Sequence, residues 1–191
     1  MNDVEQKEID AIGARILHKA SLSRLRRWST VADVLALAVP IVYMTFRYLA
    51  KGTPLAGGVE NLWELLAAAL LVIIVIKLVG RWPDKAEQHS RLIGENISLI
   101  TQARALRRKP QPLSDDTVYA FSLLADSIEK QDHDSLSGMP ADERKNAYRE
   151  ALKEFGGPDV ECPVCHASPW FYTKGTCEAC GNRKPTDKGT T

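Results

Sequence analysis

Two long apolar runs decide the fold of this 191-residue chain: WSTVADVLALAVPIVYMTFRYLA at residues 28–50 and LWELLAAALLVIIVIKLVG at residues 62–80. Both are within the roughly 17 to 25 residues that a helix needs to cross the hydrocarbon core of a bilayer. The centre of the second run is apolar on every side of a helix, and the rest of the chain is too short to enclose two such helices. The runs therefore predict two membrane spans rather than two buried core helices.

The connector between the runs, KGTPLAGGVEN at residues 51–61, contains one proline and three glycines. A short loop of this composition makes its flanking helices antiparallel neighbours, so residues 28–82 are predicted to form a transmembrane hairpin. Several basic residues come before the first run and after the second, whereas the connector contains one lysine. The flanking residues are Arg24, Arg26, Arg27, Arg81, Lys85 and Arg91. By the positive-inside rule, both termini are expected in the cytoplasm. The chain is thus predicted to be a multi-pass membrane protein with the lipid bilayer as a partner.

Ionisable residues inside the predicted spans are the first candidate functional residues, because charge in a membrane is costly and is usually paired or exposed to water. In an antiparallel hairpin, Asp33 is level with Lys77, and Arg47 is level with Glu64. Glu64 and Lys77 are about 140° apart on a helix, so at most one of the two pairs is expected to be direct. One interpretation is structural pairing or snorkelling. In the other, Glu60 and Glu64 form an acidic ring at the outer mouth of an oligomer and favour cations.

Pro40 is in the middle of the first predicted span. A proline there removes one helical hydrogen bond and permits a kink, which makes Pro40 a candidate hinge. The alternative is that neighbouring groups simply accommodate it, as they do in many transmembrane helices.

Helical periodicity extends on both sides of the hairpin. Residues 1–27 carry an apolar stripe and predict a cytoplasmic amphipathic helix. Residues 83–157 predict a cytoplasmic helical region with helices ending near Arg108 and starting at Ser114 and Pro140. The polar segment 129–138 resembles a linker, in which His133 is expected to be solvated. Because the apolar stripes need partners, a homo-oligomer is favoured.

Four cysteines form the most specific motif of the chain: Cys162-x2-Cys165-x11-Cys177-x2-Cys180. Paired CxxC knuckles are typical of a tetrahedral zinc site, and four cysteine ligands leave no open position for catalysis. We therefore predict one structural Zn²⁺ per chain. Two disulfides or a redox dithiol are the alternatives; the expected cytoplasmic location disfavours disulfides, and no βαβ pattern supports a thioredoxin-like motif.

Residues 158–184 are predicted to form a small zinc ribbon around this ion, since so few residues cannot build an apolar core without a staple. Trp170, Phe171 and Tyr172 favour a short strand, and Lys174 and Gly175 favour a turn after it. Residues 185–191 are expected to be a disordered tail. Acidic and basic residues balance around the ribbon, which makes nucleic acid an unlikely partner and favours a protein partner.

The composition supports an all-α integral membrane protein without an enzymatic centre. The formal net charge is +1, yet residues 81–111 are basic and residues 112–159 are acidic, which argues against a general polyanion binder. The sequence has no P-loop, no Gly-rich dinucleotide turn, no HExxH motif and no nucleophile elbow. We therefore expect a protein that is not an enzyme.

The cysteine spacing, at the end of a short chain with two spans, resembles that of the mobilome CxxCx(11)CxxC proteins. The order of an amphipathic helix, a hairpin and cytoplasmic helices over residues 5–130 is similar to the SLATT two-transmembrane effectors. These resemblances imply a membrane effector of a bacterial anti-phage or mobile-element conflict system. Such an effector oligomerises and permeabilises the inner membrane when a protein or a nucleotide signal, encoded nearby, triggers it. The alternative is a membrane-anchored adaptor whose zinc ribbon recruits protein or nucleic acid.

Overall fold

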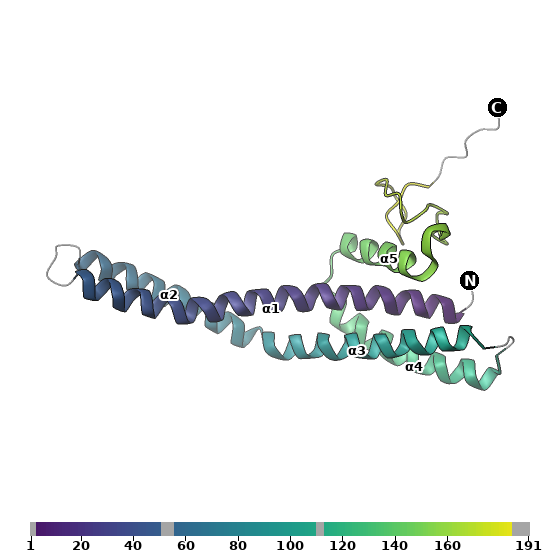
Figure 1. Ribbon diagram of the computed structural model, residues 1–191, viewed down its shortest axis with the longest axis horizontal. Coiled ribbons are helices and arrows are strands. Elements are labelled where there is room, and N and C mark those ends of the chain that lie inside the picture. Colours follow the sequence, from purple (N-terminus) through teal and green to yellow (C-terminus); the bar gives the residue numbers. More distant parts are fainter. Residues whose placement is uncertain (1–2, 51–55, 110–112, 185–191) are drawn as a thin grey trace, which may run out of the picture. The chain divides into compact units, whose positions relative to one another are not determined.

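The computed structural model describes residues 3–50, 56–109 and 113–184; helices make up most of these residues as far as Asp159, and no strand is named among them. This confirms the prediction of a helical protein. The expected tail at residues 185–191 is outside the described residues. The elements are α1 (Asp3–Ala50), α2 (Ala56–Val79), α3 (Trp82–Arg107), α4 (Asp115–Leu136), α5 (Ala141–Gly156) and the 3-10 turn η1 (Gly157–Asp159) (Figure 1).

The chain divides into two compact units. Met1–Ala20 and His89–Thr191 form one, here called the bundle unit, and Ser21–Gln88 form the other, the hairpin unit. The predicted amphipathic helix and the first predicted span are a single helix, α1, of 48 residues. No glycine or proline lies between residues 14 and 39, so nothing in the sequence interrupts the helix there.

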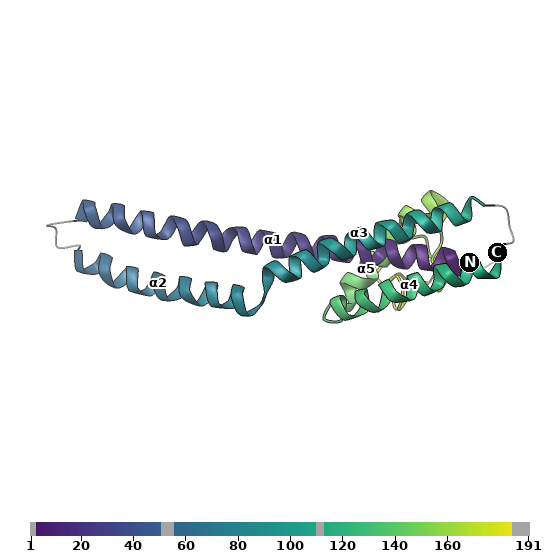
Figure 2. The ribbon, with the colours of Figure 1, turned by 90° about the horizontal axis from the view of Figure 1, so that it is seen from below.

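The hairpin unit pairs the second part of α1 with α2, which lie side by side in both views (Figures 1 and 2). α2 begins at Ala56, so residues 56–61 are helical and not part of a turn as the glycines had suggested. Tyr43 and Trp63 stack at a centroid distance of 4.2 Å and join the two helices. Two helices, Asp3–Leu49 and Leu62–Val79, are long and apolar enough to span a membrane, and their most apolar windows are almost entirely unburied.

The bundle unit has one main apolar core, made by the first turns of α1 together with α3, α4 and α5. In α1 the core residues repeat at helical spacing, and the cysteine-containing segment adds its thiols to the same core. The largest of its members are Ile9, Ile12, Leu99, Ile100, Phe121, Ile128 and Leu152. The amphipathic stripes predicted before and after the hairpin therefore pack on one another within one chain.

The predicted linker at residues 129–138 is wrong over most of its length, because α4 continues to Leu136. The buried stripe of α4 runs through Phe121, Ala125 and Ile128 and continues to Asp132 and Leu136. Asp132 interrupts the apolar pattern of the stripe, so the sequence does not indicate that the stripe continues to Leu136. His133 is exposed, as expected, and Ser114 is the N-cap residue of α4.

Candidate metal centre and membrane charges

The four cysteines converge in the structure. All four are buried, none is in a disulfide, and their Sγ atoms all lie within 4.8 Å of one another. The Sγ atoms of Cys165 and Cys180 are 3.5 Å apart, far longer than the roughly 2.05 Å of a disulfide bond. Tetrahedral zinc with Zn–S bonds of about 2.3 Å separates its sulfurs by about 3.8 Å. The donor set and its spacing therefore fit a metal ion held by Cys162, Cys165, Cys177 and Cys180.

The two knuckles have the same backbone geometry. In the first, the His166 amide donates to the Cys162 carbonyl at 2.8 Å; in the second, the Gly181 amide donates to the Cys177 carbonyl at 2.9 Å. Both donors have positive φ, 59° at His166 and 74° at Gly181. Glycine adopts this conformation at little cost, whereas histidine does so against the usual steric preference. Each knuckle thus presents two thiols from one tight turn.

Hydrogen bonding and burial act in opposite directions on the thiols. Burial raises the pKa of Cys165 and of Cys180. Burial also acts to raise the pKa of Cys177, but hydrogen bonds from the Cys180 and Ala179 amides and from neighbouring thiols outweigh it and lower this pKa to about 7. Amide donors aimed at a sulfur favour the thiolate, which is the form that binds metal.

α5 supports the cysteine module. The Arg149 guanidinium lies 3.9 Å from the centroid of the Tyr172 ring and donates to the Cys180 carbonyl at 2.9 Å. The Trp170 indole donates to the Gly157 carbonyl at 2.7 Å. Asn182, which is 1% exposed, accepts from the Thr173 amide and donates to the Ser168 carbonyl. No sequence pattern indicates this role for Asn182, because its partners are backbone groups.

The module is less ribbon-like than expected. Trp170 and Phe171 lie in a turn and a bend and not in a strand. The antiparallel pairing that the described residues contain is a single bridge between Lys174 and Asn182. Knuckle turns and packing against α5 take the place of a sheet.

The whole chain was compared with known protein families, and the model of the mobilome CxxCx(11)CxxC proteins matches residues 1–183. The chain belongs to this family. No curated protein and no solved structure matches it. The match extends beyond the cysteine motif, since it takes in both apolar helices and the bundle as well. The resemblance to SLATT effectors rests on element order alone and stays a prediction.

The structure brings together one of the two predicted charge pairs. Lys77 Nζ lies 2.5 Å from Asp33 Oδ1, and the Ser29 hydroxyl also donates to Asp33. Arg47 and Glu64, both described, form no ion pair with each other; the Arg47 guanidinium lies 5.9 Å from the Tyr43 ring centroid instead. The structure therefore contains one direct pair, as the positions of Glu64 and Lys77 around the second helix predict.

The remaining membrane candidates are on the surface of the hairpin unit. Glu60, Glu64 and Arg47 are exposed. Pro40 is exposed inside α1, and the helix continues on both sides of it. The Thr45 hydroxyl donates to the Ile41 carbonyl one turn earlier in the same helix.

If the hairpin spans a membrane, breaking the Asp33–Lys77 pair should impair insertion. The change Lys77→Leu leaves the Asp33 carboxylate without its cation, and an unpaired carboxylate in the middle of a span costs about 2 to 3 kcal/mol in apparent insertion free energy. The double change Asp33→Leu with Lys77→Leu should restore insertion. Glycosylation-site mapping in microsomes measures both, and equal insertion of Lys77→Leu and the unmodified chain would contradict the pairing.

The structure also shows buried charges that sequence reasoning missed. Glu8 is fully buried and lies within ion-pair distance of Arg104 (2.8 Å) and Arg107 (3.1 Å) on α3. Its partners are about a hundred residues away in the chain, so no local pattern could have shown the contact.

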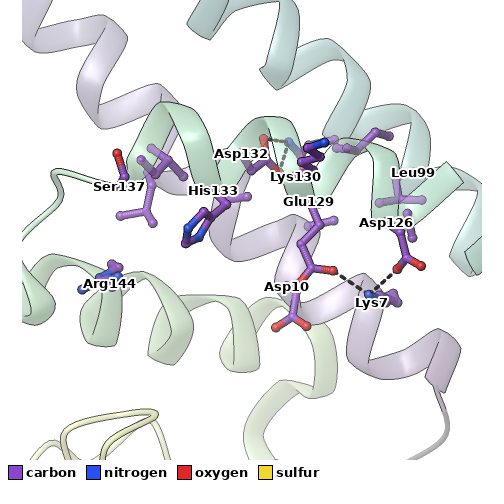
Figure 3. Close-up of a pocket in the computed structure, with 17 residues that line it drawn as sticks. Lys7, Asp10, Leu99, Asp126, Glu129, Lys130, Asp132, His133, Ser137 and Arg144 are labelled. Carbon is purple, nitrogen blue, oxygen red and sulfur yellow. Dashed lines mark hydrogen bonds and ion pairs between the residues drawn. The ribbon is translucent and has the colours of Figure 1, made fainter. Parts of the chain in front are cut away.

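A cavity of about 510 Å³ opens between α1, α3, α4 and α5 of the bundle unit (Figure 3). At one side of it Lys7 contacts Asp126 and Glu129, and Arg144 of α5 lies apart from them. Asp132 lines the same cavity and bonds to Asn96. Much of the polar lining is therefore engaged in pairs within the chain.

Proposed function

We propose that the chain is a membrane effector of a bacterial anti-phage or mobile-element conflict system. Its hairpins assemble into a homo-oligomer that permeabilises the inner membrane on a cytoplasmic trigger, a protein or a nucleotide signal encoded nearby. One observation carries the proposal: Glu60, Glu64 and Arg47 are exposed on a hairpin whose two spans expose mostly apolar side chains. Charges facing lipid are costly, and an oligomer that encloses them around water removes that cost.

The cysteine module has a structural role in this proposal. Zn²⁺ is the metal that four thiolates favour, with one ion per chain and no open coordination position. The bundle unit and its module stand on the cytoplasmic side of the inner membrane and receive the trigger. The chain is not an enzyme, and nucleic acid is an unlikely partner, because the charges around the module are mixed.

Induced expression with a membrane-potential dye tests permeabilisation. Cells that make the chain together with the products of its genomic neighbours should depolarise, and cells that never depolarise would exclude a pore.

In lipid bilayers, changing both Glu60 and Glu64 to Gln should reduce the preference for cations without lowering insertion, because the acidic ring loses its charge. Changing Glu87 to Gln, an exposed carboxylate outside both apolar windows, is the matched control. Unchanged selectivity in the double variant would contradict the ring.

The second candidate is a membrane-anchored adaptor, in which the hairpin is only a tether. It is favoured by apolar side chains that the cysteine module leaves exposed: Val164, Trp170, Phe171 and Tyr172. Large exposed aromatic side chains are typical of protein-binding surfaces. Membrane depolarisation distinguishes the two candidates, since a tether leaves the potential unchanged.

A further inference from the structure

A row of buried polar side chains crosses the bundle unit from α1 to α3 and α4. His18 and Asn96 are fully buried, and Asp132 is 7% exposed. His18 Nδ1 lies 2.8 Å from Nδ1 of His89, and His18 Nε2 lies 2.8 Å from Asp132 Oδ1. The Asn96 amide donates to both oxygens of Asp132, at 3.1 and 3.0 Å, and to the Leu92 carbonyl.

These contacts determine where the hydrogens are. Asp132 accepts from Asn96 on both oxygens, so it acts as a carboxylate and takes a further hydrogen bond from Nε2–H of His18. A neutral imidazole with its hydrogen on Nε2 has a lone pair on Nδ1. His18 Nδ1 must then accept, and His89 must donate through Nδ1–H. This direction places both rings in defined tautomers at neutral pH.

The same contacts limit how many protons the row can hold. One added proton on His89 makes that ring an imidazolium, and its contact with His18 is kept because His89 already donates through Nδ1. Its charge is offset by the carboxylate of Asp132 through His18. A second added proton has to go to Nδ1 of His18, where it meets the Nδ1–H of His89. Two donors and two like charges cannot remain 2.8 Å apart.

We propose that His18, His89 and Asp132 form a proton-binding switch that holds α1 against α3 and α4 until a second proton enters, and then opens. An imidazole exposed by the opening changes charge between about pH 5 and 8, so mild acidification favours the open, doubly protonated state. This inference does not depend on the proposed membrane function, because all the residues belong to the bundle unit.

Two charged residues near the row, Arg15 and Arg91, are each in an ion pair with a glutamate. Arg15, one turn before His18 on α1, pairs with Glu154 of α5. On α3, Arg91 pairs with Glu95 at 3.5 Å. The residues next to Asp132 on α4, Gln131 and His133, are half-buried and exposed respectively. Asp132 is thus the carboxylate in direct contact with His18, and it sets the direction of the hydrogen bonds.

Side-chain nitrogen NMR of the full chain in detergent micelles tests the hydrogen positions. At about pH 7.5, where imidazoles are largely neutral, His18 should show the Nε2–H tautomer and His89 should carry hydrogen on Nδ1. His18 with hydrogen on Nδ1 would overturn the switch, because its contact with His89 would then run in the opposite direction.

Hydrogen exchange of the same full-length protein tests the opening. Amides of α1 around residue 18 and of α3 around residues 89–96 should lose protection at about pH 5, after correction for intrinsic exchange. An opening that takes up one extra proton becomes about tenfold more favourable for each pH unit. Unchanged protection between the two pH values would overturn the proposal.

The variant His89→Asn separates the switch from general acid sensitivity. Its amide nitrogen takes the place of Nδ1 and donates at neutral pH; after a rotation its oxygen accepts from a protonated His18. We expect acid-induced opening to be lost in this variant and kept in the matched control His133→Asn, which changes an exposed histidine of α4. If His89→Asn opens like the unmodified chain, the second histidine is not the sensor.

Discussion

The purified wild-type chain is expected to carry about one zinc ion, and replacing Cys162 and Cys165 by serine is expected to remove that ion and to unfold the cysteine module. Serine is a poor ligand for this ion, and Cys177 and Cys180 alone cannot complete a tetrahedron. Structural zinc contributes on the order of 10 kcal/mol or more to the folding of small domains. Metal analysis of the purified full chain gives the stoichiometry, and hydrogen exchange over residues 158–184 reports the unfolding.

The change His166→Gly is the control for this experiment. His166 borders the first knuckle with a positive φ of 59°, which glycine adopts readily, and its side chain is largely exposed. The variant should therefore keep its zinc and its protection from exchange. Zinc-free wild-type protein, or full zinc content in the serine variant, would refute the four-cysteine site.

Replacing Arg104 by methionine is expected to lower the free energy of unfolding of the bundle unit by about 3 kcal/mol. The side chain of Glu8 is fully buried, and Arg104 donates to it at 2.8 Å; this hydrogen bond also raises the pKa of Arg104. Without Arg104, the carboxylate stays buried, and Arg107 is its remaining ion-pair partner among the described residues. Exchange of α3 and α4 amides in the full chain measures the loss.

Two further variants identify the cause of that loss. Arg108→Met removes an exposed neighbouring charge, and we expect a change within about 0.5 kcal/mol. In the double variant Glu8→Met with Arg104→Met, an apolar pair of similar volume replaces the ion pair, and much of the stability should return. If the double variant is no more stable than Arg104→Met, the buried charge is not the source of the loss.

The features that could be predicted from the sequence are those that do not depend on an unknown contact with a distant segment of the chain. About twenty consecutive apolar residues meet the length requirement of a bilayer by themselves, and the paired CxxC knuckles define a ligand set by spacing. The level of Asp33 with Lys77 follows from helix geometry and hairpin length. All three features can be found by counting residue positions along the sequence.

The features that were missed depend on contacts between distant segments. The partner of His18 in α4 is 114 residues away, and that of Glu8 in α3 is 96 residues away. Asp132 lies in a segment whose polarity predicts a linker, although it stands four residues after Ile128 and four before Leu136, both buried. In a sequence, a single carboxylate within an apolar stripe indicates that the stripe ends there. Only the contact with a buried histidine explains why the stripe continues beyond it.

The bundle unit is discontinuous in sequence: Met1–Ala20 belong to it together with His89–Thr191, and the hairpin unit lies between them in the chain. During synthesis the first turns of α1 leave the ribosome long before the helices that cover Ile9 and Ile12 exist. Both apolar runs emerge in that interval. Nascent chains therefore carry an uncovered apolar stripe while the whole hairpin unit is synthesised, and a chain that stops before α3 can never cover it.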